Sequence, residues 1–165
     1  MNTLNHIAFI MDGNGRWGRK KNKGRNFGHL KGVETVKKIV KFSIKLKIPI
    51  LSFYVFSSEN WRRPRKEINY LFKLIEKYFL EEIDNIKSEG IKIKIIGELK
   101  KLPPNLKKIL NETMLITKKN KRIIVNLAIN YGSKNEIIKT SNSFKKKTSI
   151  KNFEKKLYTS NLPHP

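Results

Sequence analysis

The chain has 165 residues, which is enough for one domain with a substantial hydrophobic core but short for two. It contains no cysteine, which excludes disulfides, thiol nucleophiles and cysteine metal sites and suits a reducing compartment. The net charge of +24 favours an anionic partner, but most of the basic residues are scattered lysines, which argues against a specific nucleic-acid interface.

Taken in chain order, short apolar runs alternate with longer segments of helical periodicity. The runs HIAFIM (6–11), IPILSFYVF (48–56), IKIKIIG (91–97) and RIIVNLAIN (122–130) predict strands. Helices are expected at 27–47, 67–90, 105–120, 133–144 and 150–158, with an exposed linker at 145–149. The alternation predicts an α/β fold over 1–165, a single domain with a mostly parallel central sheet and helices on both faces. No signal peptide or membrane span is visible, so we expect a cytoplasmic location.

Three polar segments follow predicted strands. DGNGRW comes after the first strand, SSENWRR after the second and NYGS after the fourth. Ligands of parallel α/β sheets bind outside the carboxyl ends of the strands, so these segments are expected to meet at one edge of the sheet. The topology alone therefore predicts a site there.

The first polar segment belongs to a stretch, residues 11–32, that holds six of the nine glycines. Gly13 and Gly15 permit close backbone approach and positive φ, so that successive N–H groups can face an anion. Asp12 can hold a hard cation. Neither a Walker loop nor a dinucleotide fingerprint is present. A tight turn is the alternative explanation for the glycines alone.

Charged and aromatic residues in the same stretch favour an anion site over a simple turn. Arg16 and Arg25 add positive charge, and the helix expected to begin near Phe27 presents its N-terminus nearby. His29 lies close to that helix start and is a candidate diphosphate ligand. The combination predicts a cradle for a diphosphate–Mg²⁺ group.

The second polar segment, FSSENWRRP (56–64), offers several side chains suited to a phosphorylated ligand. Ser57 and Ser58 can donate to phosphate oxygens, Asn60 can orient a substrate or water, and Trp61 can pack on an apolar group. In the alternative interpretation, Ser58 and Glu59 cap a helix that Pro64 opens, and Trp61 belongs to the core.

The arginines are distributed differently from the lysines. Six of the seven lie in two short segments, 16–25 and 62–65: Arg16, Arg19, Arg25, Arg62, Arg63 and Arg65. A guanidinium grips phosphate bidentately in a way that lysine cannot imitate. A chain that uses lysine almost everywhere else is therefore expected to need that geometry in these two places.

The motifs HIAFIMDGNGRWGRKKNKGRNFGHLKG, LSFYVFSSENWRRPRKEI and NLAINYGS together resemble those of the cis-prenyltransferases, the isoprenyl transferases typified by undecaprenyl diphosphate synthase. The resemblance implies a homodimeric, Mg²⁺-dependent α/β enzyme. Such an enzyme condenses isopentenyl diphosphate with an allylic diphosphate, here farnesyl diphosphate, and forms the new double bonds in cis. The implied product is undecaprenyl diphosphate, which serves as a cell-wall carrier lipid.

The resemblance also implies roles for individual residues. Asp12 would be the catalytic and Mg²⁺-binding aspartate, and Asn60 would assist deprotonation of the condensing unit. The remaining implied substrate-binding residues are Gly13, Asn14, Gly15, Arg16, Trp17, Arg25, His29, Ser57, Ser58, Glu59, Trp61 and Arg63. The helices at 27–47 and 67–90 could wall a hydrocarbon site, although for most of their apolar residues we favour a plain core.

The sequence departs from the family pattern near its C-terminus. Family members continue past LYTxxLPxPD with a strand and an RTSGE-type segment, which supplies ligands for isopentenyl diphosphate and a second acidic metal ligand. Here the chain ends at LYTSNLPHP, with His164 at a position that is usually acidic. We therefore expect a C-terminally incomplete domain. The alternatives are a weak or inactive diphosphate-binding homologue and a basic RNA-binding protein, and the positive charge also suits peripheral contact with an anionic membrane.

Overall fold

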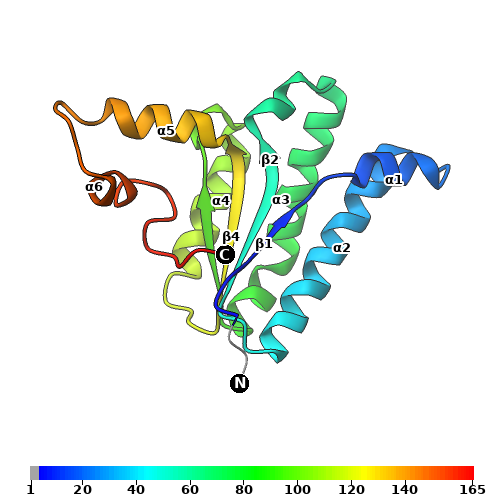
Figure 1. Cartoon of the computed structure of the whole chain (residues 1–165). Coiled ribbons are helices and arrows are strands. Elements are labelled where there is room, and N and C mark those ends of the chain that lie inside the picture. Colours follow the sequence, from blue (N-terminus) through cyan, green and yellow to red (C-terminus); the bar gives the residue numbers. More distant parts are fainter. Residues whose placement is uncertain (1–3) are drawn as a thin grey trace.

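The computed structural model describes residues 4–165 and contains a four-stranded sheet in which all strands run parallel (Figure 1). The strands are β1 (Ile7–Ile10), β2 (Ile50–Ser57), β3 (Ile91–Ile96) and β4 (Ile123–Tyr131), in the spatial order β1-β2-β4-β3. Each lies within a predicted run or extends one residue beyond it. The predicted parallel α/β sheet is therefore confirmed.

Helices occupy every connection between the strands, and two more follow β4. They are α1 (Asn14–Lys20), α2 (Gly24–Lys45), α3 (Arg65–Ser88), α4 (Pro104–Ile116), α5 (Ser133–Asn142) and α6 (Ile150–Glu154), with 3₁₀ turns η1 (Ser58–Arg62) and η2 (Leu99–Lys101). Three expected bounds are wrong by three or four residues: α2 begins before Phe27, α4 ends at Ile116 instead of residue 120, and α6 ends at Glu154 instead of residue 158. No helix in the described part of the chain combines the length and apolar character needed to cross a bilayer.

Helix α1 was not among the expected helices, which began at residue 27. Gly13 precedes it in a left-handed conformation, with φ of 88°, which an L side chain rarely adopts. The helix packs on α2 so closely that a Cβ added to Gly28 would lie 1.8 Å from the carbonyl oxygen of Asn14. Several glycines of the 11–32 stretch therefore serve helix–helix packing.

One face of the sheet carries the hydrophobic core. Phe53 of β2 is completely buried, is paired in register with Leu127 of β4, and stacks on Phe9 of β1 at 5.1 Å between ring centroids. Helices α2, α3 and α4 cover this face, with Phe79 of α3 and Leu106 of α4 buried against it. The core fixes the strand ends and thereby the edge at which the polar segments meet.

The opposite face of the sheet carries a buried polar chain. His6 Nδ1 donates to the carbonyl oxygen of Pro163 at 2.7 Å, because a carbonyl oxygen only accepts. In the neutral ring, Nε2 then accepts from the Ser52 hydroxyl at 2.8 Å, and Ser52 Oγ accepts from Asn126 Nδ2 at 3.0 Å. The C-terminal segment, which crosses in front of β4 in Figure 1, is held to the sheet by this chain.

Ser52→Ala should lower the free energy of unfolding by about 2–4 kcal/mol, because it leaves ring and amide groups of two buried residues without their partner. Urea unfolding measures the effect. Ser141→Ala, which removes an exposed hydroxyl from α5, is the matched control and should change little. Equal midpoints for the two variants would contradict the prediction.

Candidate active site

The three polar segments meet at the carboxyl edge of the sheet, as expected. They line one cavity of about 430 Å³, to which Asp12 contributes from the end of β1, Ser57 and Asn60 from the end of β2, and Tyr131 from the end of β4. The parallel arrangement of β1, β2 and β4 places these ends side by side. The predicted convergence is confirmed.

Asp12 lies on the solvent side of the cavity. Its Oδ1 accepts from the Gly13 amide at 2.7 Å and its Oδ2 accepts from Arg16 Nη2 at 2.8 Å. The side chains of Asp12 and Arg16 are 66% and 71% exposed, so this ion pair contributes little to stability. Both charged groups are therefore free to rearrange around a ligand. Gly13 has the expected positive φ, whereas Gly15 lies within α1 and does not.

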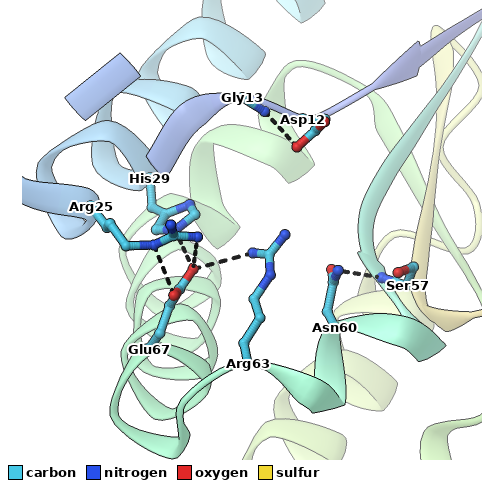
Figure 2. A network of polar contacts seen from close by, with 8 residues as sticks. All are labelled: Asp12, Gly13, Arg25, His29, Ser57, Asn60, Arg63 and Glu67. Carbon is cyan, nitrogen blue, oxygen red and sulfur yellow. Dashed lines mark hydrogen bonds and ion pairs between the residues drawn. The ribbon is translucent and has the colours of Figure 1, made fainter. Parts of the chain in front are cut away.

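A buried carboxylate gathers three of the candidate diphosphate ligands. Arg25 contacts Glu67 through Nε at 2.9 Å and Nη2 at 3.0 Å, His29 through Nε2 at 3.2 Å, and Arg63 through Nη1 at 3.4 Å. Glu67 is only 8% exposed. Figure 2 shows the three side chains converging on it, with Arg63 extending into the space between Glu67 and Asp12. The first turns of α2 and α3 are thus joined at the mouth of the cavity.

The protonation states of this cluster follow from its contacts. Burial opposes ionisation of Glu67, but the hydrogen bonds from Arg25 and His29 and the charges of Arg25 and Arg63 outweigh it and hold the pKa of this carboxyl below its ordinary value. Burial lowers the pKa of His29, and the hydrogen bond and charge of Glu67 offset only part of that effect. At neutral pH, two guanidinium cations and one carboxylate leave one net positive charge beside a neutral imidazole.

The η1 turn arranges the residues that follow β2. Asn60 Oδ1 accepts from the Ser57 amide at 3.1 Å, which closes the turn and holds the Asn60 side chain at the cavity (Figure 2). Trp61 packs edge-on against Phe56 and Phe72 and donates from Nε1 to Asn130 Oδ1 at 2.7 Å. These contacts match the core interpretation of Trp61, although the ring remains 37% exposed.

The cavity collects some of the predicted residues and leaves others outside. Those on its wall are Asp12, Asn14, His29, Ser57, Glu59, Asn60 and Arg63. Ser58 and Trp61 line a second hollow, to which Ser57 and Glu59 also contribute. Trp17 lies away from both, stacked on Phe27 at 5.8 Å. Gly15 leaves room for Arg25, whose guanidinium carbon would lie 3.1 Å from a Cβ at this position.

The interior of the cavity is apolar. Its wall there consists of Val33 and Val36 of α2, Leu71, Leu74, Ile75, Tyr78 and Phe79 of α3, and Leu127 and Ile129 of β4. Burial raises the pKa of Tyr78 to about 12, so its hydroxyl is neutral. The apolar stripe of α3 is therefore shared: some of its residues form the core and others face the cavity.

The cavity lies at the carboxyl edge of a parallel sheet and joins a cationic mouth to an apolar interior. Comparisons with known proteins identify a family to which this chain is similar. Residues 10–165 match the protein family described as "Putative undecaprenyl diphosphate synthase". The chain belongs to this family. The expectation drawn from the three sequence motifs is thereby confirmed.

Individual members of this isoprenyl transferase family support the same assignment. The isoprenyl transferase of Prochlorococcus marinus is 45% identical over 144 residues, which cover 87% of this chain and 53% of that protein. That of Clostridium perfringens is 41% identical, covering 97% of this chain and 67% of that protein. The chain thus spans about half the length of several curated relatives that it matches.

Solved structures share the fold. A Campylobacter jejuni protein, described as "a probable undecaprenyl diphosphate synthase", has a TM-score of 0.78 and 29% identity over 96% of this chain and 71% of its own. Lavandulyl diphosphate synthase from Lavandula x intermedia, solved in complex with dimethylallyl diphosphate, has a TM-score of 0.90 over 95% of this chain and 72% of its own. Its identity is 24%, so this likeness concerns the fold.

Sequence reasoning missed two residues that organise this candidate site. Glu67 was not predicted as a site residue, although a carboxylate four residues after Arg63 is able to pair with it on a helix. Asn130 was not singled out within NLAINYGS. It adopts φ of 52°, is 4% exposed, and links Trp61 to the carbonyl oxygen of Glu98. Asparagine adopts the left-handed conformation more readily than most residues, which is the one weak signal that the sequence offers for this position.

The carboxylates restrict where a metal ion can bind in this family member. No group of three or more histidine, aspartate or glutamate side chains among residues 4–165 could hold one. Mg²⁺, however, commonly takes one or two protein carboxylates together with substrate phosphates. Asp12, exposed at the cavity mouth, fits a metal that arrives bound to a diphosphate.

Proposed function

We propose that the cavity binds an allylic diphosphate, with farnesyl diphosphate as the primer, for condensation with isopentenyl diphosphate to a cis-polyprenyl diphosphate of the undecaprenyl type. The observation that carries this proposal is the single cavity that joins a cationic mouth to an apolar interior. An amphipathic substrate with a charged head and a hydrocarbon tail is complementary to both parts.

The proposed chemistry depends on charge at the mouth of the cavity. The bond between the allylic carbon and the diphosphate breaks, and the electron pair leaves with the diphosphate. The developing negative charge would be stabilised by Arg16, Arg25 and Arg63, with His29 beside them. Mg²⁺ held by Asp12 would supply further neutralisation when bound. The double bond of isopentenyl diphosphate supplies the electron pair for the new bond to the allylic carbon, and the resulting cation loses a proton to the released diphosphate. We assign the Asn60 amide the role of orienting the condensing unit for this proton loss.

The direct test combines product formation with binding. The protein is incubated with farnesyl diphosphate, labelled isopentenyl diphosphate and Mg²⁺, and butanol-extractable products are counted. Isothermal titration with farnesyl diphosphate is run in parallel. Labelled products support the transferase, whereas saturable binding without products supports the second candidate, a diphosphate-binding homologue. Absence of both would overturn the proposal.

Two assembly properties belong to the same proposal. The resemblance implies a homodimer, which sedimentation equilibrium would detect as a mass of twice 19.4 kDa. The net charge of +24 suits peripheral contact with anionic lipid. Salt-sensitive co-sedimentation with phosphatidylserine vesicles, and none with phosphatidylcholine vesicles, is expected.

Leu74→Trp should separate short from long allylic substrates. Leu74 is half-buried on the apolar wall, so a larger ring takes up space that a hydrocarbon tail would fill. The dissociation constant for farnesyl diphosphate should rise about 10-fold or more. That for dimethylallyl diphosphate should change little, because its short tail stays near the mouth. Titration of both ligands measures this, and equal losses for the two would contradict a tail site in this cavity.

A further inference from the structure

We propose that Glu67 is a positioning residue that holds Arg25, His29 and Arg63 converged on the diphosphate position before any ligand arrives. The inference rests on the proposed function, because it concerns the same site. His29 and Arg63 line the cavity, whereas Arg25 and Glu67 are not on its wall. The effect of Glu67 on a ligand is therefore transmitted through the residues that it contacts.

The contact pattern leaves donors available to an anion. Arg25 uses Nε and Nη2 on Glu67, and Arg63 uses only Nη1, at the longer distance of 3.4 Å. Each guanidinium thus keeps further N–H groups for a phosphate oxygen. Without the shared carboxylate, the two cations would repel one another and occupy many rotamers, and ligand binding would have to order them.

The carboxylate also fixes the imidazole. An ionised carboxylate only accepts, so His29 Nε2 must carry the proton in its 3.2 Å contact with Glu67. In the neutral ring Nδ1 carries no proton and can only accept, so it becomes a donor to a phosphate oxygen when a bound diphosphate keeps the ring protonated. Three charged side chains face the imidazole ring: Arg25 from α2, Glu67 from the first turn of α3, and Arg63 from the segment just before α3. Glu67 thereby sets the tautomer as well as the orientation of His29.

Removal of the negative charge distinguishes this role from simple electrostatics. Glu67→Gln removes a charge that would repel a diphosphate, so charge alone predicts tighter binding. Positioning predicts the opposite, because Gln cannot hold two guanidinium groups and an imidazole at once. We expect the dissociation constant for inorganic diphosphate, measured by isothermal titration without Mg²⁺, to rise about 10-fold or more.

Glu82→Gln is the matched control. Glu82 also lies on α3 and also pairs with α2, through Lys37 Nζ at 2.5 Å, but it does not contact the three candidate ligands. Both variants should lose some stability, whereas only Glu67→Gln should weaken diphosphate binding. In an Arg25→Gln/Arg63→Gln background, Glu67→Gln should have a much smaller effect, because its partners are already absent.

The tautomer of His29 in the wild-type protein is a second test, which does not depend on whether Glu67→Gln folds. Long-range ¹H–¹⁵N spectra should assign His29 as the Nε2–H tautomer, with a pKa below the ordinary 6.5. An Nδ1–H tautomer, or unchanged or tighter diphosphate binding by Glu67→Gln, would overturn the positioning role. If wild-type protein binds no diphosphate in the presence or absence of Mg²⁺, the proposed function itself fails instead.

Discussion

Gly28→Ala is expected to remove α1 from its position on α2 and to lower the free energy of unfolding by at least about 3 kcal/mol. The added methyl carbon would lie 1.8 Å from the Asn14 carbonyl oxygen and 2.7 Å from its carbonyl carbon. These are backbone atoms, so no rotation of a side chain relieves the overlap. The helices must separate, and Asp12 and Arg16 then move away from the diphosphate position.

The matched control is Gly24→Ala at the start of α2. Gly24 has φ of 76°, but nothing lies within 4 Å of the Cβ position. Its substitution should therefore cost only the conformational strain, about 1–2 kcal/mol. Urea unfolding of both variants, with diphosphate titration of the folded protein, measures the difference. The close-packing account fails if Gly28→Ala is no less stable than Gly24→Ala.

The strands and long helices could be predicted because their signals are local. β2 is a run of β-branched and aromatic residues, and α3 repeats apolar residues at helical spacing, so both were placed within two residues. The parallel direction of the strands followed from the connection lengths, whereas the order β1-β2-β4-β3 was not predicted. The edge where the ligand segments meet followed in turn, since parallel strands share the direction of their carboxyl ends.

Helix α1 was not predicted because its glycine content disfavours a helix, whereas its packing against α2 stabilises one. Gly13, Gly15 and Gly18 argue against a helix by propensity. The close approach of α2 requires small residues, and contact between helices outweighs propensity once the chain is folded. A sequence without an alignment cannot separate glycines that bind a ligand from glycines that admit a neighbouring helix.

The cavity and the Glu67 cluster could not be predicted for a similar reason. Residues on one apolar stripe of α3 divide between core and cavity wall according to where α2 lies. Arg25 and Glu67 are 42 residues apart in the chain and meet only because the first turns of two helices face each other. Contacts of this kind depend on tertiary packing, whereas the candidate ligand residues themselves were recognisable by their chemical type.

Asp12→Asn is expected to abolish the effect of Mg²⁺ on diphosphate binding and to reduce any turnover about 100-fold or more. Asp12 is the carboxylate exposed at the cavity mouth, and an amide is a poor ligand for a hard cation. Stability should stay within about 0.5 kcal/mol of wild type, because an exposed ion pair contributes little. Asp84→Asn, which changes the only other aspartate at an exposed position of α3, is the control.

The effect of Asp12→Asn on the dissociation constant for farnesyl diphosphate should have opposite signs with and without Mg²⁺, which makes this test specific. In the absence of Mg²⁺, Asp12 is a negative charge beside a diphosphate, and its neutralisation also frees Arg16 from the 2.8 Å contact. Asp12→Asn should then bind farnesyl diphosphate as tightly as wild type or more tightly. With Mg²⁺ present, wild type should gain affinity and Asp12→Asn should not, so the order of the two dissociation constants reverses. An order that is independent of Mg²⁺ would show that Asp12 acts without the metal, and the diphosphate would then be held by the arginines alone.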